Sequence, residues 1–249
     1  MNWQEYWSLW RLARRRLNSE KDYREFQTFQ AKQVARYLQE KGVQLYGKLC
    51  LDLGSGIGGY GLEFVRHGAR VILLDLMQPS LVNSPCMQIV GNGLAIPLQD
   101  ETVDFVFCAS LIEHVAEPIR LLNEIERILK CNGICYISFP PYYSPTGGHE
   151  FSPFHYLGER RALQIMRKRV RPEWVQKLYN MPAQAESFSE YFGKWGLYKM
   201  TIRRFRNLLK RVGFQCIDIS TRYMPVSFAR WPFLGEFLTW HVQFLLKKY

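Results

Sequence analysis

The sequence contains no Cys-x-x-Cys pair, although it holds six cysteines among 249 residues. Four of them, Cys50, Cys108, Cys135 and Cys216, lie in or beside short apolar segments. Cysteines in such places are typical of a reduced protein core, whereas zinc-binding or disulfide-bonded cysteines usually recur at characteristic spacings. We therefore expect neither a metal site nor a disulfide framework. We also expect a cytoplasmic location.

Long hydrophobic segments are absent as well. Residues 1–16 place three tryptophans among charged side chains, which is unlike a secretory signal. Ten uncharged residues lie between Glu236 and Lys247, whereas a helix that crosses a bilayer needs about 20 apolar residues. The share of hydrophobic residues, 47%, together with 22% charged residues is that of a folded globular chain.

Acidic side chains are scarce in the last part of the chain. The net charge is +5 over residues 1–50, −6 over residues 51–150 and +12 over residues 151–249, where 18 Lys and Arg face 6 Asp and Glu. A basic region of this size attracts nucleic acid, anionic lipid or acidic substrates, and it is equally typical of a solvated surface.

Short apolar segments alternate with amphipathic ones between residues 49 and 139. The predicted strands are 49–53, 70–76, 88–90, 103–109 and 134–139, and the predicted helices around them are 22–41, 62–68 and 117–130. Short strands that are nearly all apolar, in this alternation, are typical of a parallel sheet covered by helices on both faces. Ligands of such sheets bind beyond the carboxyl ends of the strands.

The alternation stops near residue 140 and resumes at residue 201. We predict that residues 140–200 form a helical insertion, which shapes the substrate site. A helix capped by Thr201, a strand at 214–220 and an antiparallel partner at 222–228 are predicted to follow. The predicted organisation is a helical segment (1–41), a ligand-binding domain (42–228) and a C-terminal amphipathic helix (229–249).

A glycine-rich loop follows the first strand. Its sequence, Asp52-Leu-Gly54-Ser-Gly56-Ile-Gly58-Gly59, lets the backbone turn sharply and approach a ligand at the N-terminus of the next helix. Asp75 ends the second strand, where a carboxylate accepts hydrogen bonds from a ribose diol. The spacing fits G-x-G-x-x-G and G-x-G-x-G equally well, so the residues alone predict a nucleoside-bearing ligand without naming it.

The segment 51–59, LDLGSGIGG, resembles the first motif of the class I S-adenosylmethionine-dependent methyltransferases. Further segments agree in order: 91–98 (GNGLAIPL) resembles the motif beside the adenine, and 110–115 (SLIEHV) resembles the segment after the fourth strand. The combination is most similar to the type 11 and quinone-biosynthesis subgroup. The resemblance implies an α/β, Rossmann-like sheet of seven mostly parallel strands, and S-adenosylmethionine as the cofactor.

The resemblance also implies which residues bind the cofactor. They are Asp52, Gly54, Ser55, Gly56, Gly58, Asp75, Asn92, Gly93, Leu94 and Ser110. Asn92 departs from the family, which often has Asp there; an amide oxygen still accepts a hydrogen bond from the adenine amine, but without charge. Ser110 is expected near the methionine part of the cofactor.

Candidate groups for proton removal lie where the sheet opens. A sulfonium methyl is already activated, so the protein needs to align the acceptor, exclude water and remove a proton from a hydroxyl or an ammonium group. The candidate catalytic residues are Glu113, His114 and His149, and the candidate acceptor-binding residues are Tyr142, Tyr143 and His155. The alternative is that they only orient a helix start and a loop. The histidine spacing matches no standard metal site.

Residues 229–249 combine aromatic and basic side chains. Treated as a helix, they place Phe233, Phe237, Trp240 and Phe244 on one face, which is typical of a membrane interface, of packing on the same domain or of an oligomer contact. We therefore expect a methyltransferase for a small or a lipid- or glycan-linked acceptor, peripheral on the inner membrane face. An RNA acceptor and a non-catalytic cofactor-binding accessory protein are the alternatives.

Overall fold

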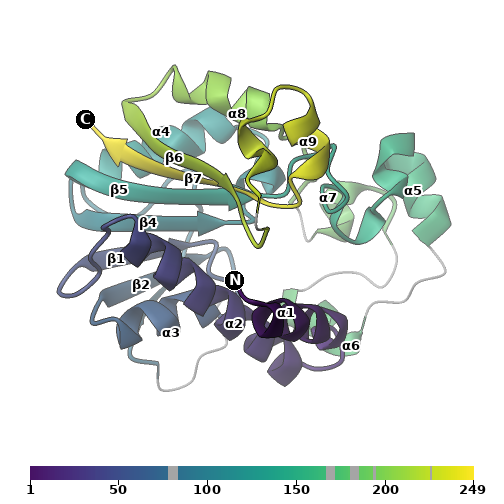
Figure 1. Ribbon diagram of the computed structural model, residues 1–249, viewed down its shortest axis with the longest axis horizontal. Coiled ribbons are helices and arrows are strands. Elements are labelled where there is room, and N and C mark those ends of the chain that lie inside the picture. The colour runs from purple at the N-terminus through teal and green to yellow at the C-terminus, as the bar shows by residue number, and fades with distance from the viewer. Residues whose placement is uncertain (78–83, 167–171, 180–184, 193–194, 225) are drawn as a thin grey trace.

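The computed structural model describes the chain except residues 78–83, 167–171, 180–184, 193–194 and 225. In this described part, seven strands form one sheet in the order β3-β2-β1-β4-β5-β7-β6 (Figure 1). Their bounds are β1 Leu49–Leu53, β2 Arg70–Asp75, β3 Met87–Val90, β4 Val103–Ala109, β5 Leu129–Phe139, β6 Phe214–Thr221 and β7 Val242–Lys248. Strands β1 to β5 are parallel, and β7 is antiparallel to β5 and β6. The predicted α/β fold is confirmed.

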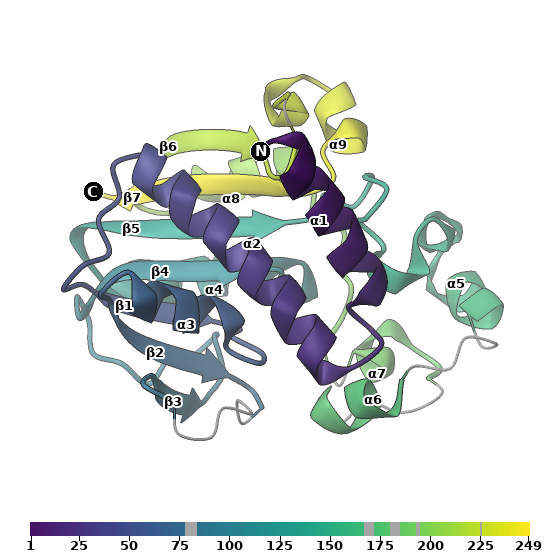
Figure 2. The ribbon, with the colours of Figure 1, turned by 60° about the horizontal axis from the view of Figure 1, so that its bottom comes forward.

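Helices cover both faces of the sheet (Figure 2). The covering helices are α2 Glu20–Glu40, α3 Gly59–Arg66, α4 Pro118–Ile128 and α8 Ile202–Leu209. Leu38 of α2 and Phe64 of α3 are buried in one hydrophobic cluster, and Ile125 of α4 and Phe205 of α8 are buried in the other. Thr201 caps α8 by accepting a hydrogen bond from the backbone N–H of Arg204, as predicted. Each helix thus turns its apolar stripe to the sheet.

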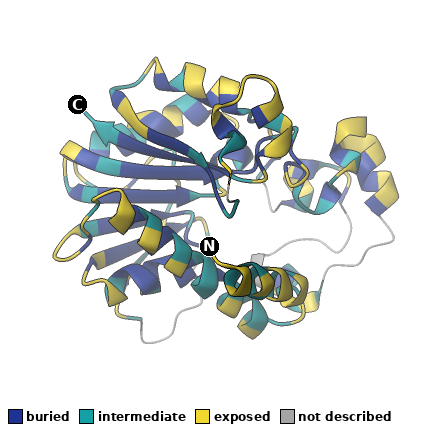
Figure 3. Cartoon of the chain, viewed as in Figure 1, coloured by how far each residue is buried: buried dark blue, intermediate teal, exposed yellow. Residues whose placement is uncertain are grey.

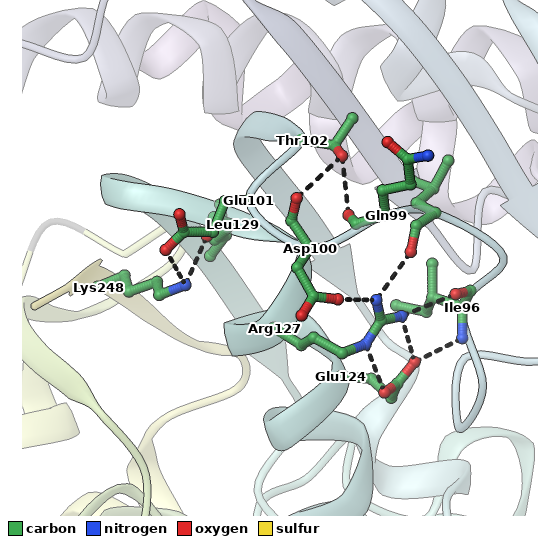
Figure 4. A network of polar contacts seen from close by, with 10 residues as sticks. Ile96, Gln99, Asp100, Glu101, Thr102, Glu124, Arg127, Leu129 and Lys248 are labelled. Carbon is green, nitrogen blue, oxygen red and sulfur yellow. Dashed lines mark hydrogen bonds and ion pairs between the residues drawn. The ribbon is translucent and has the colours of Figure 1, made fainter.

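Arg127 on α4 anchors the loop that follows β3 (Figure 4). Its guanidinium donates to the carboxylates of Glu124 (2.9 Å) and Asp100 (2.7 Å) and to the carbonyl oxygens of Ile96 and Leu98 (2.8 Å each). Arg127 thereby lowers the pKa of Glu124, which also accepts from the backbone N–H of Ile96. The segment that resembles the adenine motif is therefore fixed to α4.

Between β5 and α8 the chain leaves the sheet and forms a helical cap. Its helices are η2 His149–Phe151, η3 Phe154–Leu157, α5 Glu159–Met166, α6 Glu173–Tyr179 and α7 Phe188–Tyr191. Phe151, Leu163 and Phe188 are buried in a small core of its own. The cap lies past the carboxyl ends of the parallel strands (Figure 1), so the predicted helical insertion is confirmed over its described residues.

The C-terminal segment 229–249 is not the amphipathic helix that the sequence predicted. A 3-10 turn, η4 Phe228–Arg230, and a short helix, α9 Leu234–Leu238, are its helical parts, and β7 lies between β5 and β6. Phe244 is buried in the hydrophobic cluster on one face of the sheet and Leu245 in the cluster on the other. Most of the sheet is coloured as buried (Figure 3). The spacing of apolar residues in this segment did not distinguish a strand from a helix, because a continuous apolar run fits a strand buried on both faces as well as a helix. Strand β7, and not residues 222–228, is therefore the antiparallel partner of β6.

Because residues 242–248 form a strand, the aromatic helical face that suggested a membrane or oligomer contact does not exist. No helix of the described part has the length and apolar character needed to cross a membrane. At the other end of the chain, α1 (Trp3–Arg15) packs along α2 and leaves Trp3 and Trp7 exposed.

Candidate functional site

The glycine loop after β1 adopts a backbone conformation that favours glycine. Gly54, Gly56 and Gly58 have φ values of +75°, +53° and +75°. A Cβ atom on Gly54 would also lie 3.2 Å from the side chain of Leu111. Gly58 is the N-cap of α3, so the loop leads directly to the unpaired N–H groups of a helix N-terminus, where anionic or polar ligand groups are stabilised.

Two buried carboxylates support this loop from different sides. Asp75 accepts hydrogen bonds from the backbone N–H groups of Gly56 (2.8 Å) and Met77 (3.1 Å). Asp52 accepts from the N–H of Gly61 at 3.0 Å, so it fixes the first turn of α3. Burial raises the pKa of Asp75 and raises the pKa of Asp52 to about 7. Asp75 therefore touches the loop itself, whereas Asp52 acts on the helix behind it.

The other predicted cofactor residues follow β3 and β4. Asn92 Oδ1 accepts from the N–H of Leu94 at 2.9 Å, so this side chain closes its own turn. A Cβ atom on Gly93 would lie 3.1 Å from the side chain of Leu121. Ser110 has a φ of +53° and its N–H donates to the carbonyl oxygen of Ser138 at 2.8 Å. Because β1 to β4 are parallel, all these residues reach the same edge of the sheet.

The three candidate catalytic residues come together at this edge. Glu113 and His114 lie in the turn after β4, and His149 begins η2 of the cap. His149 Nε2 lies 3.4 Å from Glu113 Oε1, and the imidazole rings of His114 and His149 are 4.8 Å apart between centroids. Glu113 is 2% exposed, and its two carboxylate oxygens accept no hydrogen bond within the described part of the chain. His149 was a candidate from its sequence, and the fold of the cap is what brings it beside Glu113 and His114.

His114 is held as a neutral base by its surroundings. Its Nδ1 lies 2.6 Å from the carbonyl oxygen of Gly196, so Nδ1 carries the proton and Nε2 keeps its lone pair. Burial, and secondly the neighbouring His149, lower the pKa of His114 to about 4. At neutral pH the Nε2 atom therefore accepts hydrogen bonds rather than donating them.

This group can also hold a divalent cation. One ligand atom from each of Glu113, His114 and His149 lies within 4.8 Å of the other two. Two imidazoles and one carboxylate, with one ring oriented by a backbone carbonyl, are a donor set that transition metals accept. The chemistry of the donors thus fits a metal, although the sequence predicted none.

Several buried polar atoms at the same edge have no hydrogen-bond partner among the residues that the structure describes. Besides Glu113 and His149, they include Ser55 Oγ, Ser138 Oγ, Arg222 Nε and His241 Nε2. Ser138 is the last residue but one of β5, Arg222 follows β6 and His241 precedes β7. Since an unpaired buried polar atom costs free energy, such atoms are usually reserved for a ligand or ordered water. Sequence reasoning missed these three residues, because only the sheet order brings them together.

The candidate acceptor-binding residues lie at the base of the cap and contact one another. The fully buried His155 has its Nε2 atom 2.8 Å from the carbonyl oxygen of Tyr142, whose hydroxyl donates to the carbonyl oxygen of His155. Tyr143 stacks on Phe237 with 5.6 Å between ring centroids. His155 is thus engaged in closing the cap loop, which favours the structural alternative for this residue.

Residues 51–137 match the family model described as a methyltransferase domain. Over these residues the chain carries a methyltransferase domain of the class I S-adenosylmethionine-dependent family. It is 33% identical over 133 residues to an uncharacterized methyltransferase of Mycobacterium leprae (51% of this chain, 49% of that protein). It is 28% identical over 200 residues to one of Mycobacteroides abscessus (69% and 76%). The chain thus spans about half the length of the first curated relatives that it matches.

Solved structures of the family share the fold. An S-adenosylmethionine-dependent methyltransferase from Mesorhizobium loti superposes with a TM-score of 0.57 at 16% identity, covering 86% of this chain and 96% of that one. A Burkholderia thailandensis N-methyltransferase, solved with 1,6-didemethyltoxoflavin and S-adenosylhomocysteine, gives 0.54 at 13% identity, with 87% and 76% covered. The methyl donor of the family is S-adenosylmethionine. The glycine cradle and the unpaired, buried Ser55 Oγ fit such a ligand.

Proposed function

We propose that the chain transfers a methyl group from S-adenosylmethionine to a small, or a lipid- or glycan-linked, acceptor bound between the carboxyl edge of the sheet and the cap. The observation that carries this proposal is the meeting of Glu113, His114 and His149 across that edge. These residues lie one strand away from the glycine loop, because β4 neighbours β1.

His149 is the proposed general base. S-adenosylmethionine supplies an activated methyl group and leaves as S-adenosylhomocysteine. His149 takes the proton of the attacking hydroxyl or amine, and the carboxylate of Glu113, 3.4 Å from Nε2, stabilises the imidazolium that forms. The lone pair of His114 Nε2 accepts a hydrogen bond that orients the acceptor.

The proposed contacts to the cofactor are inferred from the family resemblance. Asp75 would accept hydrogen bonds from the ribose, and the loop from Gly54 to Gly58 would contact the methionine part of the cofactor. The turn of Asn92, Gly93 and Leu94 would flank the adenine, with Ser110 between cofactor and acceptor. Asp52 supports α3 and would act on the cofactor only through the loop.

Turnover tests the proposal. Purified protein with S-adenosylmethionine and fractionated small-molecule and lipid extracts should release S-adenosylhomocysteine and shift one acceptor by the mass of a methylene unit. Asp75→Ala should abolish both signals. Release of S-adenosylhomocysteine without a matching acceptor, or equal rates for the variant, would count against it. Complete inactivity with intact cofactor binding would favour an accessory protein.

A peripheral place at the inner membrane face remains the proposed location for a lipid-linked acceptor. It is now supported by exposed aromatic side chains rather than by a helix: Trp3 is 89% and Phe233 is 81% exposed. Aromatic and basic side chains together suit anionic headgroups. If the protein co-sediments with phosphatidylglycerol vesicles and the substitutions Trp3→Ser and Phe233→Ser abolish this binding, the result would support this location.

RNA is the second acceptor class. Some of the basic side chains that suggested it, Arg203 and Arg204 on α8 and Arg211 just after it, line an open surface pocket. Residues 167–171 lie outside the described part. Phosphate contacts make binding depend on salt. Retention of total RNA at 50 mM salt that is lost in an Arg203→Glu, Arg204→Glu variant would favour RNA over a small acceptor.

A further inference from the structure

Arg222 is a buried cation at the end of β6. It is 4% exposed, and its Nε atom has no hydrogen-bond partner in the described part of the chain. Its Nη2 donates to the hydroxyl of Tyr60 at 2.8 Å and to the carbonyl oxygen of Gln30 at 3.5 Å. Among the described residues, no carboxylate forms an ion pair with it. A buried charge without a counter-charge is costly, so such a group is normally completed by a ligand.

The surroundings of Arg222 leave room for a ligand. A cavity of about 180 Å³ lies between α1, α2 and the ends of β6 and β7, and Arg222, Arg36, Gln33 and Gln243 contribute to its lining. Arg36 is paired with Glu5 at 2.9 Å, and Glu40 is the one acidic residue in the described lining. The guanidinium also lies 4.5 Å from the centroid of the Tyr223 ring.

Arg222 forms hydrogen bonds with two residues next to the proposed active site, one at the carboxyl edge of the sheet and one after the glycine loop. Its backbone N–H donates to the carbonyl oxygen of His241, whose Nε2 is one of the unpaired atoms at the carboxyl edge. Tyr60, which accepts from its guanidinium, stands in the first turn of α3 directly after the glycine loop. The cavity lining, however, contains none of the predicted cofactor residues.

We propose that Arg222 binds an anionic group, a carboxylate or a phosphate, of the methyl acceptor. This inference rests on the proposed methyl transfer and narrows its acceptor to an anionic molecule. A guanidinium offers a fork of donors that matches the oxygens of either group, and a partly desolvated site strengthens that contact. The carboxylate of the cofactor is the other source of the same chemistry, and 5′-methylthioadenosine, which lacks that carboxylate, distinguishes the two.

Calorimetry and thermal unfolding test this site with defined probes. Inorganic phosphate or acetate should raise the melting temperature of wild-type protein, with and without S-adenosylhomocysteine, more than sodium chloride of equal ionic strength does. Arg222→Met, which keeps the apolar stem of the side chain and removes the guanidinium, should bind the anion at least about tenfold more weakly. Arg230→Met is the matched control, because Arg230 lies nearby but pairs with Asp218 at 3.0 Å. It should keep the full response.

Three results would overturn the assignment. They are no anion response in the wild type, an equal response in Arg222→Met, and a loss of S-adenosylhomocysteine binding in Arg222→Met while 5′-methylthioadenosine, which has no carboxylate, binds as before. The last result would assign Arg222 to the cofactor. If Arg222→Met does not fold, Arg222→Lys keeps the charge but not the fork and should still weaken anion binding. Wild-type binding of S-adenosylhomocysteine reports separately on the proposed function.

Discussion

His149 Nε2 lies 3.4 Å from Glu113 Oε1, although the histidine belongs to the cap and the glutamate to the turn after β4. The two residues are separated by all of α4 and β5 in the sequence. The cap therefore contributes a side chain to the proposed site as well as covering it. Placement of the cap fixes the distance between the proposed base and the carboxylate.

Removal of the base should slow methyl transfer without weakening cofactor binding. His149→Gln is expected to lower kcat by about 10²–10⁴-fold for a hydroxyl acceptor, because proton transfer in the transition state contributes about that much. The rate of S-adenosylhomocysteine formation and a calorimetric titration would separate the two effects. His67→Gln is the control, since His67 pairs with Glu63 at 3.7 Å on α3, away from the edge. Equal rates for His149→Gln and wild type would exclude the assigned role.

The depressed pKa of His114 predicts a stability change in acid. The folded pKa is about 4 and the ordinary histidine value is 6.5, so the unfolded chain binds more protons at this residue between these values. The contribution of His114 to the free energy of unfolding should therefore fall as the pH is lowered from about 6.5 to 4. His114→Asn keeps a donor for the Gly196 carbonyl and removes the titration, and it should show a smaller fall. Urea midpoints at pH 7 and pH 5 measure the difference; parallel curves would contradict it.

Gly54→Ala tests the glycine loop against a matched glycine. Both Gly54 (φ +75°) and Gly42 (φ +77°) are left-handed, but only a Cβ on Gly54 meets a neighbour, the side chain of Leu111 at 3.2 Å. Each alanine should cost about 1–2 kcal/mol of backbone strain. Only Gly54→Ala should also weaken S-adenosylhomocysteine binding, by about tenfold or more. Equal affinities in the two variants would place the ligand elsewhere.

Two phenylalanines of the C-terminal segment test the corrected fold. Phe244 is fully buried in β7, whereas Phe237 is 52% exposed on α9. Phe244→Ala should lower the free energy of unfolding by about 3–5 kcal/mol, and Phe237→Ala by less than about 1 kcal/mol. An amphipathic helix with both rings on one face would give similar losses. Denaturant unfolding of the two variants decides between them.

The parallel part of the fold was predictable because each segment carries its own signal. Strands such as Leu49–Leu53 are nearly all apolar, and the glycine loop has a spacing that few structures need. Strand β7 was not predictable, because its apolar sequence fits a helix as well as a strand. Only its pairing with β5 and β6 decides between the two.

The site was predictable where its residues follow strands and not where it depends on distant segments. Glu113 and His114 follow β4, so their place at the edge could be foreseen. Arg222 and His241 become neighbours only through the pairing of β6 with β7, which joins them by a backbone hydrogen bond of 2.8 Å. Whether a buried polar atom lacks a hydrogen-bond partner can also be seen only in the folded chain and not in the sequence.

The most direct test of the central claim is a calorimetric titration with S-adenosylhomocysteine, with NAD as the comparison ligand. The account predicts micromolar binding of S-adenosylhomocysteine alone, weakened by about tenfold or more in Asp75→Ala through loss of charged hydrogen bonds. Asp104→Ala, which removes a carboxylate at the opposite edge of the sheet where it accepts from the Leu49 N–H, should leave the affinity unchanged. Binding of NAD instead, or equal affinity in Asp75→Ala, would contradict it.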